Sequence, residues 1–211
     1  MKDLPMFTTE NGVASLTLQE IPYCKAAYIT VHSTTDLKAL IAECADFCKA
    51  VGAERVYACG CDLIDYPLYT EVWEMSAERS KLPQTDARLC PVNADSLQTF
   101  LEIYRKKMKD VPVAAYLTIE KGRQLVQKGN CYFVHRNDAL IGIGVAGEGK
   151  IQSVASLVPG GGKDAVLALC DRLSSQRISL EVASENRKAV SLYESLGFSK
   201  EKVRNTWYKI L

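Results

Sequence analysis

The stretch Ile178–Phe198, ISLEVASENRKAVSLYESLGF, decides the fold of the chain. Apolar and polar residues alternate at its start, which is typical of a strand with one buried face. Asn186 then stands at a helix N-cap, where its side chain is expected to accept a backbone N–H. Gly197 is expected to end the helix in the left-handed conformation, with Phe198 folded back onto the last turn. The stretch therefore predicts a strand, a capped helix of about three turns and the start of another strand.

The spacing of apolar residues inside this helix predicts one buried face. Four of them follow at i, i+3, i+4 and i+7, which places them on one side of a helix. With Asn186, Gly197 and Phe198 they form the pattern N-x-x-A-x-x-L-Y-x-x-x-G-F. This pattern resembles the strand-five and helix-four signature of the GNAT superfamily of acetyl-CoA-dependent N-acyltransferases. The alternative is an ordinary amphipathic helix with a tyrosine and a C-terminal glycine. The four apolar positions are Ala189, Leu192, Tyr193 and Leu196.

The resemblance extends from about Asp86 to the C-terminus and is absent, or present only as an echo, before Leu82. It implies an α/β fold whose central mixed, mostly antiparallel sheet parts between its fourth and fifth strands. It also implies two domains, an acetyltransferase domain over residues 86–211 and a smaller N-terminal α/β subdomain over residues 1–82 without an active site. The polar segment Ser80–Asp86, which holds a proline, is the expected linker.

Length and composition place the chain among ordinary globular proteins. Its 211 residues are enough to bury a sizeable core, and 47% are hydrophobic with a formal net charge of +1. A charge near zero argues against a protein that depends on neutralising nucleic-acid phosphates. No apolar run approaches the length of a membrane span, and the N-terminus lacks a signal-peptide core. We therefore expect a cytoplasmic protein that binds neither nucleic acid nor membrane.

The eight cysteines are interpreted as buried thiols. Most lie in apolar segments, where free cysteine packs as a small hydrophobic residue. A disulfide framework is not expected without a secretion signal. The C-x-x-x-C and C-x-C spacings differ from those of common zinc sites, so no metal is expected. The cysteines are Cys24, Cys44, Cys48, Cys59, Cys61, Cys90, Cys131 and Cys170.

The N-terminal part of the chain echoes the region that leads into the decisive stretch. In both places a strand, a loop, a helix and a second strand follow one another, which suggests a degenerate GNAT-like half-domain produced by duplication. Convergent β-α-β patterning explains the echo equally well, because such units recur on many folds. The pattern predicts strands at 12–20, 25–32, 55–59 and 69–75, and a helix from Asp36 to about Val51 that Gly52 ends.

The C-terminal part is predicted to have the element order β-α-α-β-β-β-α-β-α-β, which is the order that the GNAT resemblance implies. A hairpin is expected at Asn137-Asp138, because this dipeptide suits a tight turn between two strands. The predicted elements are a strand at 87–92, helices at 94–109 and 115–128, hairpin strands at 130–135 and 139–147, a strand at 151–158, a helix at 163–173, and strands at 178–183 and 203–210.

A run of three glycines precedes the helix at 163–173. A helix N-terminus offers backbone N–H groups to phosphates, and glycines allow close approach. By resemblance this run is the coenzyme A loop, with Lys163 and Asp164 beside the pyrophosphate. The usual Gln/Arg-x-x-Gly-x-Gly/Ala pattern is not legible here, and an ordinary glycine turn is the alternative. The three glycines are Gly160, Gly161 and Gly162.

The resemblance also implies where acyl transfer occurs. Leu157 and Val158 would pair with the pantetheine arm, and the Val158 N–H would polarise the thioester carbonyl. Tyr193 would donate a proton to the departing thiolate; the alternative is a core tyrosine with a satisfied hydroxyl. Asn186 would bind the pantetheine amide as well as capping its helix, although capping alone would explain it.

The general base is left between two glutamates. Glu181 lies on the predicted fifth strand and Glu148 in the turn before the fourth, and either could take an ammonium proton directly or through water. Each is also explained as a solvated surface glutamate. The only histidines, His32 and His135, stand at strand ends, so no Ser-His-Asp or Cys-His arrangement competes.

The predicted function is direct acetyl transfer from acetyl-CoA to a primary amine, on a small molecule or a peptide, in a ternary complex. The alternative is an acyl-CoA-binding sensor or pseudoenzyme without turnover. The N-terminal part is assigned no chemistry, and a partner-binding role for it is a third hypothesis. The sequence leaves the amine acceptor unidentified and a homodimeric state open.

Overall fold

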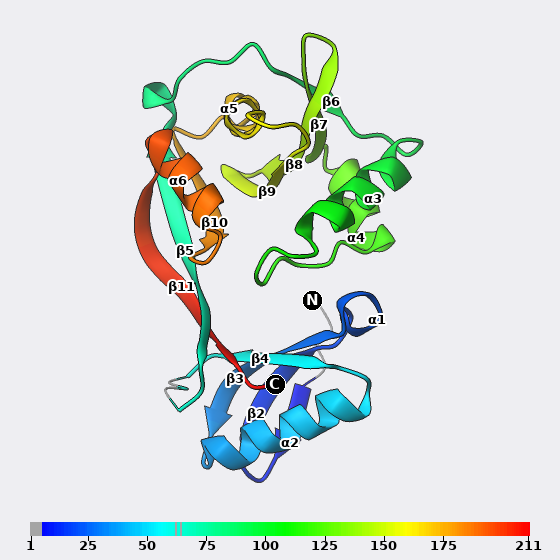
Figure 1. Ribbon diagram of the computed structural model, residues 1–211, viewed down its shortest axis with the longest axis vertical. Coiled ribbons are helices and arrows are strands. Elements are labelled where there is room, and N and C mark those ends of the chain that lie inside the picture. The colour runs from blue at the N-terminus through cyan, green and yellow to red at the C-terminus, as the bar shows by residue number, and fades with distance from the viewer. Residues whose placement is uncertain (1–5, 62, 64) are drawn as a thin grey trace. The chain divides into compact units, whose positions relative to one another are not determined.

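The computed structural model describes residues 6–61, 63 and 65–211 (Figure 1). The chain divides into two compact units: Met1–Val72 with Val203–Leu211, called the first unit here, and Trp73–Lys202, the second unit. Two long strands, β5 (Leu68–Glu78) and β11 (Ser199–Lys209), each contribute residues to both units. This division differs from the predicted boundary at residues 82–86, and the two predicted domains stay a prediction.

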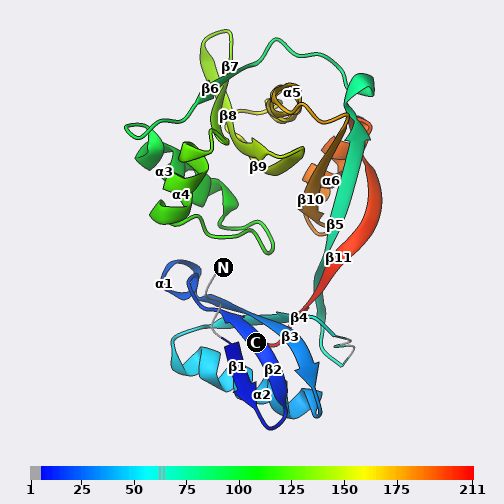
Figure 2. The same cartoon turned by 180° about the vertical axis from the view of Figure 1, so that it is seen from behind.

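The first unit is a sheet with one long helix on one face (Figure 2). Its strands follow the order β1-β2-β3-β4-β11, with β3 and β4 parallel over five residue pairs. Helix α2 begins after Asp36, whose carboxylate accepts the Ala39 N–H at 3.0 Å, as expected of a cap. The elements are β1 (Met6–Thr9), β2 (Gly12–Thr17), α1 (Ile21–Cys24), β3 (Ala26–Thr34), α2 (Leu37–Ala50) and β4 (Arg55–Cys59).

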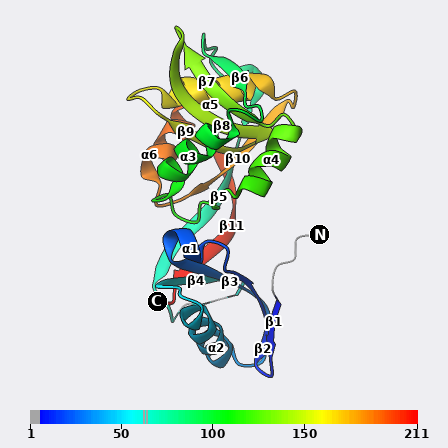
Figure 3. The same cartoon turned by 90° about the vertical axis from the view of Figure 1, so that its right-hand side faces the viewer.

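The second unit has helices on both faces of its sheet, in the strand order β11-β5-β10-β9-β8-β7-β6. Helices α3 and α4 lie side by side (Figure 3) and pack on β7, β8 and β9, while α5 and α6 share a core with β5, β9 and β10. The strands are β6 (Arg88–Pro91), β7 (Cys131–Arg136), β8 (Ala139–Gly147), β9 (Lys150–Ser156) and β10 (Arg177–Ala183), and the helices are α3 (Leu97–Met108), α4 (Ile119–Gln127), α5 (Gly162–Arg172) and α6 (Arg187–Ser195), with a 3₁₀ turn at Arg79–Lys81.

Helix α5 is buried because strand β8 offers it a surface of glycines. A Cβ at Gly144 would lie 2.4 Å from Leu169, and one at Gly142 would lie 3.0 Å from Ala165. Six consecutive residues of α5, from Ala165 to Cys170, are buried. A helix that is apolar on every side needs such close neighbours all round.

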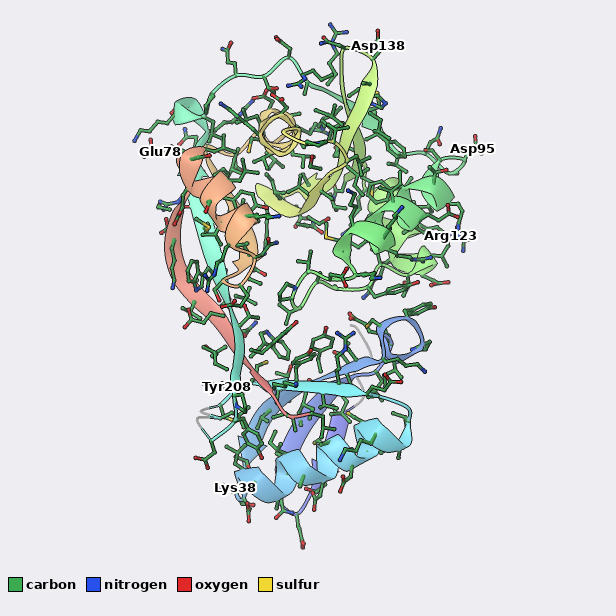
Figure 4. All side chains as sticks on the ribbon, viewed as in Figure 1. Lys38, Glu78, Asp95, Arg123, Asp138 and Tyr208 are labelled. Carbon is green, nitrogen blue, oxygen red and sulfur yellow. The ribbon has the colours of Figure 1, made fainter. Side chains whose placement is uncertain are left out.

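The hairpin and the end of α6 confirm two detailed predictions. Asn137 and Asp138 both have positive φ, 49° and 60°, in the turn between β7 and β8, and Asp138 lies at its tip (Figure 4). Gly197 has φ 95°, and the Phe198 N–H donates to the Tyr193 carbonyl at 3.0 Å. The Phe198 and Tyr193 rings contact each other with centroids 6.0 Å apart. This is the C-terminal motif that the sequence predicts.

Several predicted boundaries are wrong by a few residues. Helix α3 begins at Leu97 instead of residue 94, because Asn93 and Ser96 bond to each other in a preceding turn. Helix α4 begins after Thr118, whose hydroxyl accepts the Lys121 N–H at 3.3 Å. Strand β9 ends at Ser156 instead of residue 158. Strand β1 and the short helix α1 are not among the predicted elements.

Replacing Gly197 by alanine should lower the free energy of unfolding by about 1–2 kcal/mol, because an L-residue is strained in this conformation. No atom lies within 4 Å of a Cβ built there, so steric clash adds nothing. Urea unfolding measures the loss, and Gly197→Asn is the control, since asparagine tolerates positive φ better. Equal losses in the two variants would contradict this explanation.

Candidate active site

The candidate site is built around two parallel strands that part from each other. Strands β9 and β10 pair only at Lys150 with Ser179 and at Ile151 with Leu180 (Figure 1). Beyond these pairs, no residue of the described β9 joins β10, although β9 continues to Ser156 and β10 to Ala183. Unpaired backbone N–H and C=O groups require another partner. The strands therefore form a gap that is closed at one end and open at the other.

A bulge in β9 coincides with the closed end of the gap. Across β8 and β9, Val145 pairs with Ser153 and Ala146 with Ile151, so Gln152 is an additional residue in β9. Bulges bend a strand and increase its local twist. The bulge follows the last pair between β9 and β10, so it gives a physical reason why the two strands diverge there.

The glycine run lies at the open end and begins helix α5. The helix starts at Gly162 with Gly161 as N-cap and no capping side chain. A Cβ at Gly161 would lie 2.9 Å from Val158 and 3.1 Å from the Ile141 carbonyl, and one at Gly162 would lie 3.1 Å from Leu192. The first N–H groups of a helix have no partner inside it. A compact, uncapped helix start is therefore available to an anion.

The acidic residue in the first turn of α5 is neutralised. The Asp164 carboxylate forms an ion pair with Arg136 at the end of β7, and it accepts a hydrogen bond from the Thr85 hydroxyl at 2.8 Å. A negative charge beside a bound phosphate would be unfavourable, and the Arg136 guanidinium offsets it. Lys163 forms no hydrogen bond or ion pair with another described residue.

Tyr193 on α6 is 8% exposed. Burial, with a smaller contribution from the nearby Cys170 thiol, raises its pKa to about 12, so the phenol keeps its proton at neutral pH. Its hydroxyl makes no hydrogen bond with another described residue, yet it is not among their fully enclosed unpartnered polar atoms. The phenol is therefore protonated and has an accessible oxygen.

Glu181 lies next to the closed end of the gap and is held by a lysine. The Lys150 Nζ lies 2.6 Å from the Glu181 Oε1, and the side chains are 36% and 39% exposed. Glu148, the other predicted base, stands in the turn between β8 and β9 with φ 53°. Of the two glutamates, Glu181 is the one that borders the gap.

Several predicted site residues lie around the start of α5. Val158 lies beside the glycine run, and Leu192, next to Tyr193 in α6, lies 3.1 Å from a Cβ built at Gly162. The Leu157 N–H donates to the Ile141 carbonyl at 2.8 Å and is already used. Val158 and the residue that precedes Tyr193 thus both lie at the start of α5.

Asn186 occupies the N-cap of α6, but the expected side-chain capping bond is absent. Its φ and ψ of −81° and 61° differ from the extended conformation of a capping residue. Its backbone carbonyl instead accepts the N–H groups of Ala189 and Val190 at 2.9 and 3.0 Å. The capping prediction for the Asn186 side chain is therefore wrong.

Two cavities of the described residues lie away from this gap. One of about 200 Å³ is lined by Ser76, Arg177 and Gly197 among others, and one of about 300 Å³ lies at the start of α2. Neither includes a predicted site residue. Within residues 6–61, 63 and 65–211, no three His, Cys, Asp or Glu side chains are placed to hold a metal ion. No helix in this part of the chain is long and apolar enough to span a bilayer.

Comparison with solved structures identifies the fold. A GCN5-related N-acetyltransferase from Sphaerobacter thermophilus superposes with a TM-score of 0.60 at 14% identity, covering 93% of this chain and 75% of that one. A GNAT-family acetyltransferase from Colwellia psychrerythraea superposes with a TM-score of 0.55 at 10% identity, over 97% and 84% of the two chains. This chain has the GNAT acetyltransferase fold.

Eis1 from Mycobacterium abscessus is similar over 98% of this chain and 63% of its own length, with a TM-score of 0.57 and 13% identity. No family profile matches the sequence, and comparison with curated proteins finds no match. The expected GNAT architecture, with a mixed sheet that parts between two parallel strands, is confirmed. At these identities the likeness establishes the fold alone.

Three features of the site are missing from the sequence predictions. Lys150 is the ion-pair partner of Glu181, Arg136 neutralises Asp164, and Gln152 forms the bulge. All three depend on which strands lie side by side and in what register. The sequence carries no local signal for such pairings, although an acidic residue beside a glycine run could have prompted a search for a basic partner.

The raised pKa of Tyr193 should make stability fall at high pH. Below pH 10 the tyrosine is protonated in both states; between about pH 10 and 12 the unfolded chain releases a proton that the folded chain retains. From pH 9 to pH 12 the free energy of unfolding of the parent should therefore fall. In Tyr193→Phe this fall should be smaller by up to about 3 kcal/mol. Urea unfolding at both pH values tests this, and equal drops would contradict it.

Proposed function

We propose that the chain is an N-acetyltransferase that moves an acetyl group from acetyl-CoA to a primary amine by direct attack in a ternary complex. The observation that carries the proposal is the gap between β9 and β10. It has a protonated phenol in the core that covers one face of these strands and an uncapped helix start at its open end. The GNAT fold supports the proposal through likeness of architecture.

The acyl donor fits the residues that border the gap. Gly161 and Gly162 carry no side chains at the start of α5, so a pyrophosphate can approach the N–H groups of the first turn. Lys163 adds a positive charge there, and the Val158 N–H can bond to the pantetheine arm close to its phosphate end. The unpaired edge of β9 then offers backbone N–H and C=O groups to the rest of the pantetheine arm, which would lie along β9 like an added strand.

Acetyl-CoA supplies a thioester whose carbonyl carbon can be attacked by an amine. Glu181 takes a proton from the attacking nitrogen, directly or through water. Tyr193 donates its proton to the departing thiolate, and its raised pKa keeps that proton available at neutral pH. The amine adds, the C–S bond breaks, and an amide and coenzyme A are released without a covalent enzyme intermediate.

Thermal unfolding with coenzyme A and acetyl-CoA, followed by an amine panel scored by mass spectrometry, tests this function. A ligand that binds only the folded state raises the melting temperature, and the stabilisation grows with the logarithm of its concentration over Kd. We expect a shift with both nucleotides and acetylation of at least one amine. A shift without turnover on any amine would favour an acyl-CoA sensor, and no shift would reject both functions.

Tyr193→Phe should lower kcat by about 10²–10⁴-fold, the usual contribution of a general acid, while Kd for acetyl-CoA stays unchanged. Steady-state kinetics with the best amine and isothermal titration with acetyl-CoA measure the two constants. Tyr208→Phe, in the first unit, is the matched control and should keep the parental kcat. An unchanged kcat in Tyr193→Phe would contradict the assigned role.

Gly161→Ala should weaken coenzyme A binding by about tenfold or more. The new Cβ would contact Val158 and the Ile141 carbonyl and displace the start of α5. Overpacking of this kind costs about 1–3 kcal/mol. Gly129→Ala is the control, because Gly129 ends α4 with φ 66° and no atom lies within 4 Å of its Cβ. Titration calorimetry compares the two. Equal affinities in both variants would argue against phosphate binding at this loop.

A further inference from the structure

The ion pair between Lys150 and Glu181 places a primary amine of the chain itself beside the candidate site. The two residues lie on adjacent strands at the closed end of the gap, with the Nζ and Oε1 atoms 2.6 Å apart. Lys150 belongs to the strand that would carry the pantetheine arm, and Glu181 is the proposed base. The arrangement therefore resembles that of an acceptor amine about to lose its proton.

Strand alternation shows on which face of the sheet this pair lies. Ile151, Leu180 and Val182 belong to the core that α5 and α6 cover. Successive side chains of a strand point to opposite faces, so Lys150 and Glu181 lie on the other face. An amine on that face can approach the gap from the side away from Tyr193, so that nucleophile and leaving group are on opposite sides of the thioester.

We propose that Lys150 is an acyl acceptor of this chain, so that the protein acetylates its own Lys150 side chain at the gap between β9 and β10. This proposal rests on the function proposed above, since it uses the same donor, base and acid. It adds a covalent modification site. It also identifies the class of acceptor for this face of the sheet as a primary alkylamine at the end of a flexible side chain.

The step balances with acetyl-CoA as the only co-reactant. The Lys150 ammonium transfers one proton to Glu181, and its nitrogen lone pair forms a bond to the thioester carbonyl carbon. As the C–S bond breaks, the nitrogen releases its second proton to solvent, and the thiolate takes a proton from Tyr193, which regains one from solvent. The products are Nε-acetyl-Lys150 and coenzyme A. Acetylation removes the lysine charge and with it the ion pair to Glu181.

The same unit provides an internal control for nonspecific chemistry. Lys202 also lies near a carboxylate, with its Nζ 4.0 Å from Glu74 Oε2, and its side chain is 55% exposed against 36% for Lys150. Spontaneous acetylation by a thioester follows exposure, so it should modify Lys202 faster than Lys150. Acetylation at the site should reverse that order.

The experiment incubates the full chain with acetyl-CoA alone and follows peptides by mass spectrometry. We expect Lys150 to be acetylated faster than Lys202, and Glu181→Gln to slow the Lys150 reaction by about 10²-fold or more. Glu74→Gln is the matched control and should leave the Lys150 rate unchanged. Acetic anhydride, which needs no base or binding site, should modify Lys202 ahead of Lys150 in every variant.

The outcomes separate this proposal from the proposed function. Turnover of external amines with Lys150 left unmodified would overturn self-acetylation and leave the transferase intact. Acetylation of Lys150 that Glu181→Gln does not slow, or that merely matches Lys202, would also overturn it. Failure of coenzyme A to bind would reject both. If Glu181→Gln fails to fold, Tyr193→Phe replaces it and must slow Lys150 acetylation in the folded variant.

Discussion

The site depends on an interrupted hydrogen-bond ladder. Two parallel strands pair at Lys150–Ile151 and Ser179–Leu180 and then separate, leaving peptide groups in the middle of a sheet without a strand partner. Such groups are costly to leave unsatisfied when they are shielded from water. A ligand with its own amide groups can satisfy them by lying along the strand. The same interruption in the sheet thus creates the gap and leaves its backbone groups without a strand partner.

The surrounding structure keeps the ladder from closing. The bulge at Gln152 bends β9 away from β10. Helix α5 packs closely against β8 because Gly142 and Gly144 have no side chains. The first unit offers a contrast, because β3 and β4 flank α2 in the same parallel order but pair over five residues. There the carboxylate of Asp36 already satisfies the helix start. Similar local topology therefore gives an open gap in one unit and a closed sheet in the other.

Features that depend on residues close together in the sequence are predicted correctly. Features that depend on how distant strands pair are not. The turn at Asn137-Asp138 and the left-handed Gly197 are correct, because each requires a backbone conformation that few residues adopt. Tyr193 is correctly placed on a buried helix face, since helical spacing determines it. The ion pair of Lys150 and Glu181 was not predictable, because it joins residues 31 positions apart through strand pairing. The Asn186 cap fails for a related reason, since its backbone conformation is set by how β10 leads into α6.

Strand β11 begins in the second unit and ends in the first, and this has a consequence for folding during synthesis. The first unit includes the end of β11, where Tyr208 pairs with Ala58 and the Ile210 N–H bonds to the Val56 carbonyl at 2.8 Å. These partners are synthesised about 150 residues apart, so during translation one edge of β4 stays unpaired until residues 208–210 have left the ribosome. If translation stalls within the second unit, the first unit is therefore incomplete. The unpaired edge of β4 can then bind chaperones or other copies of the chain.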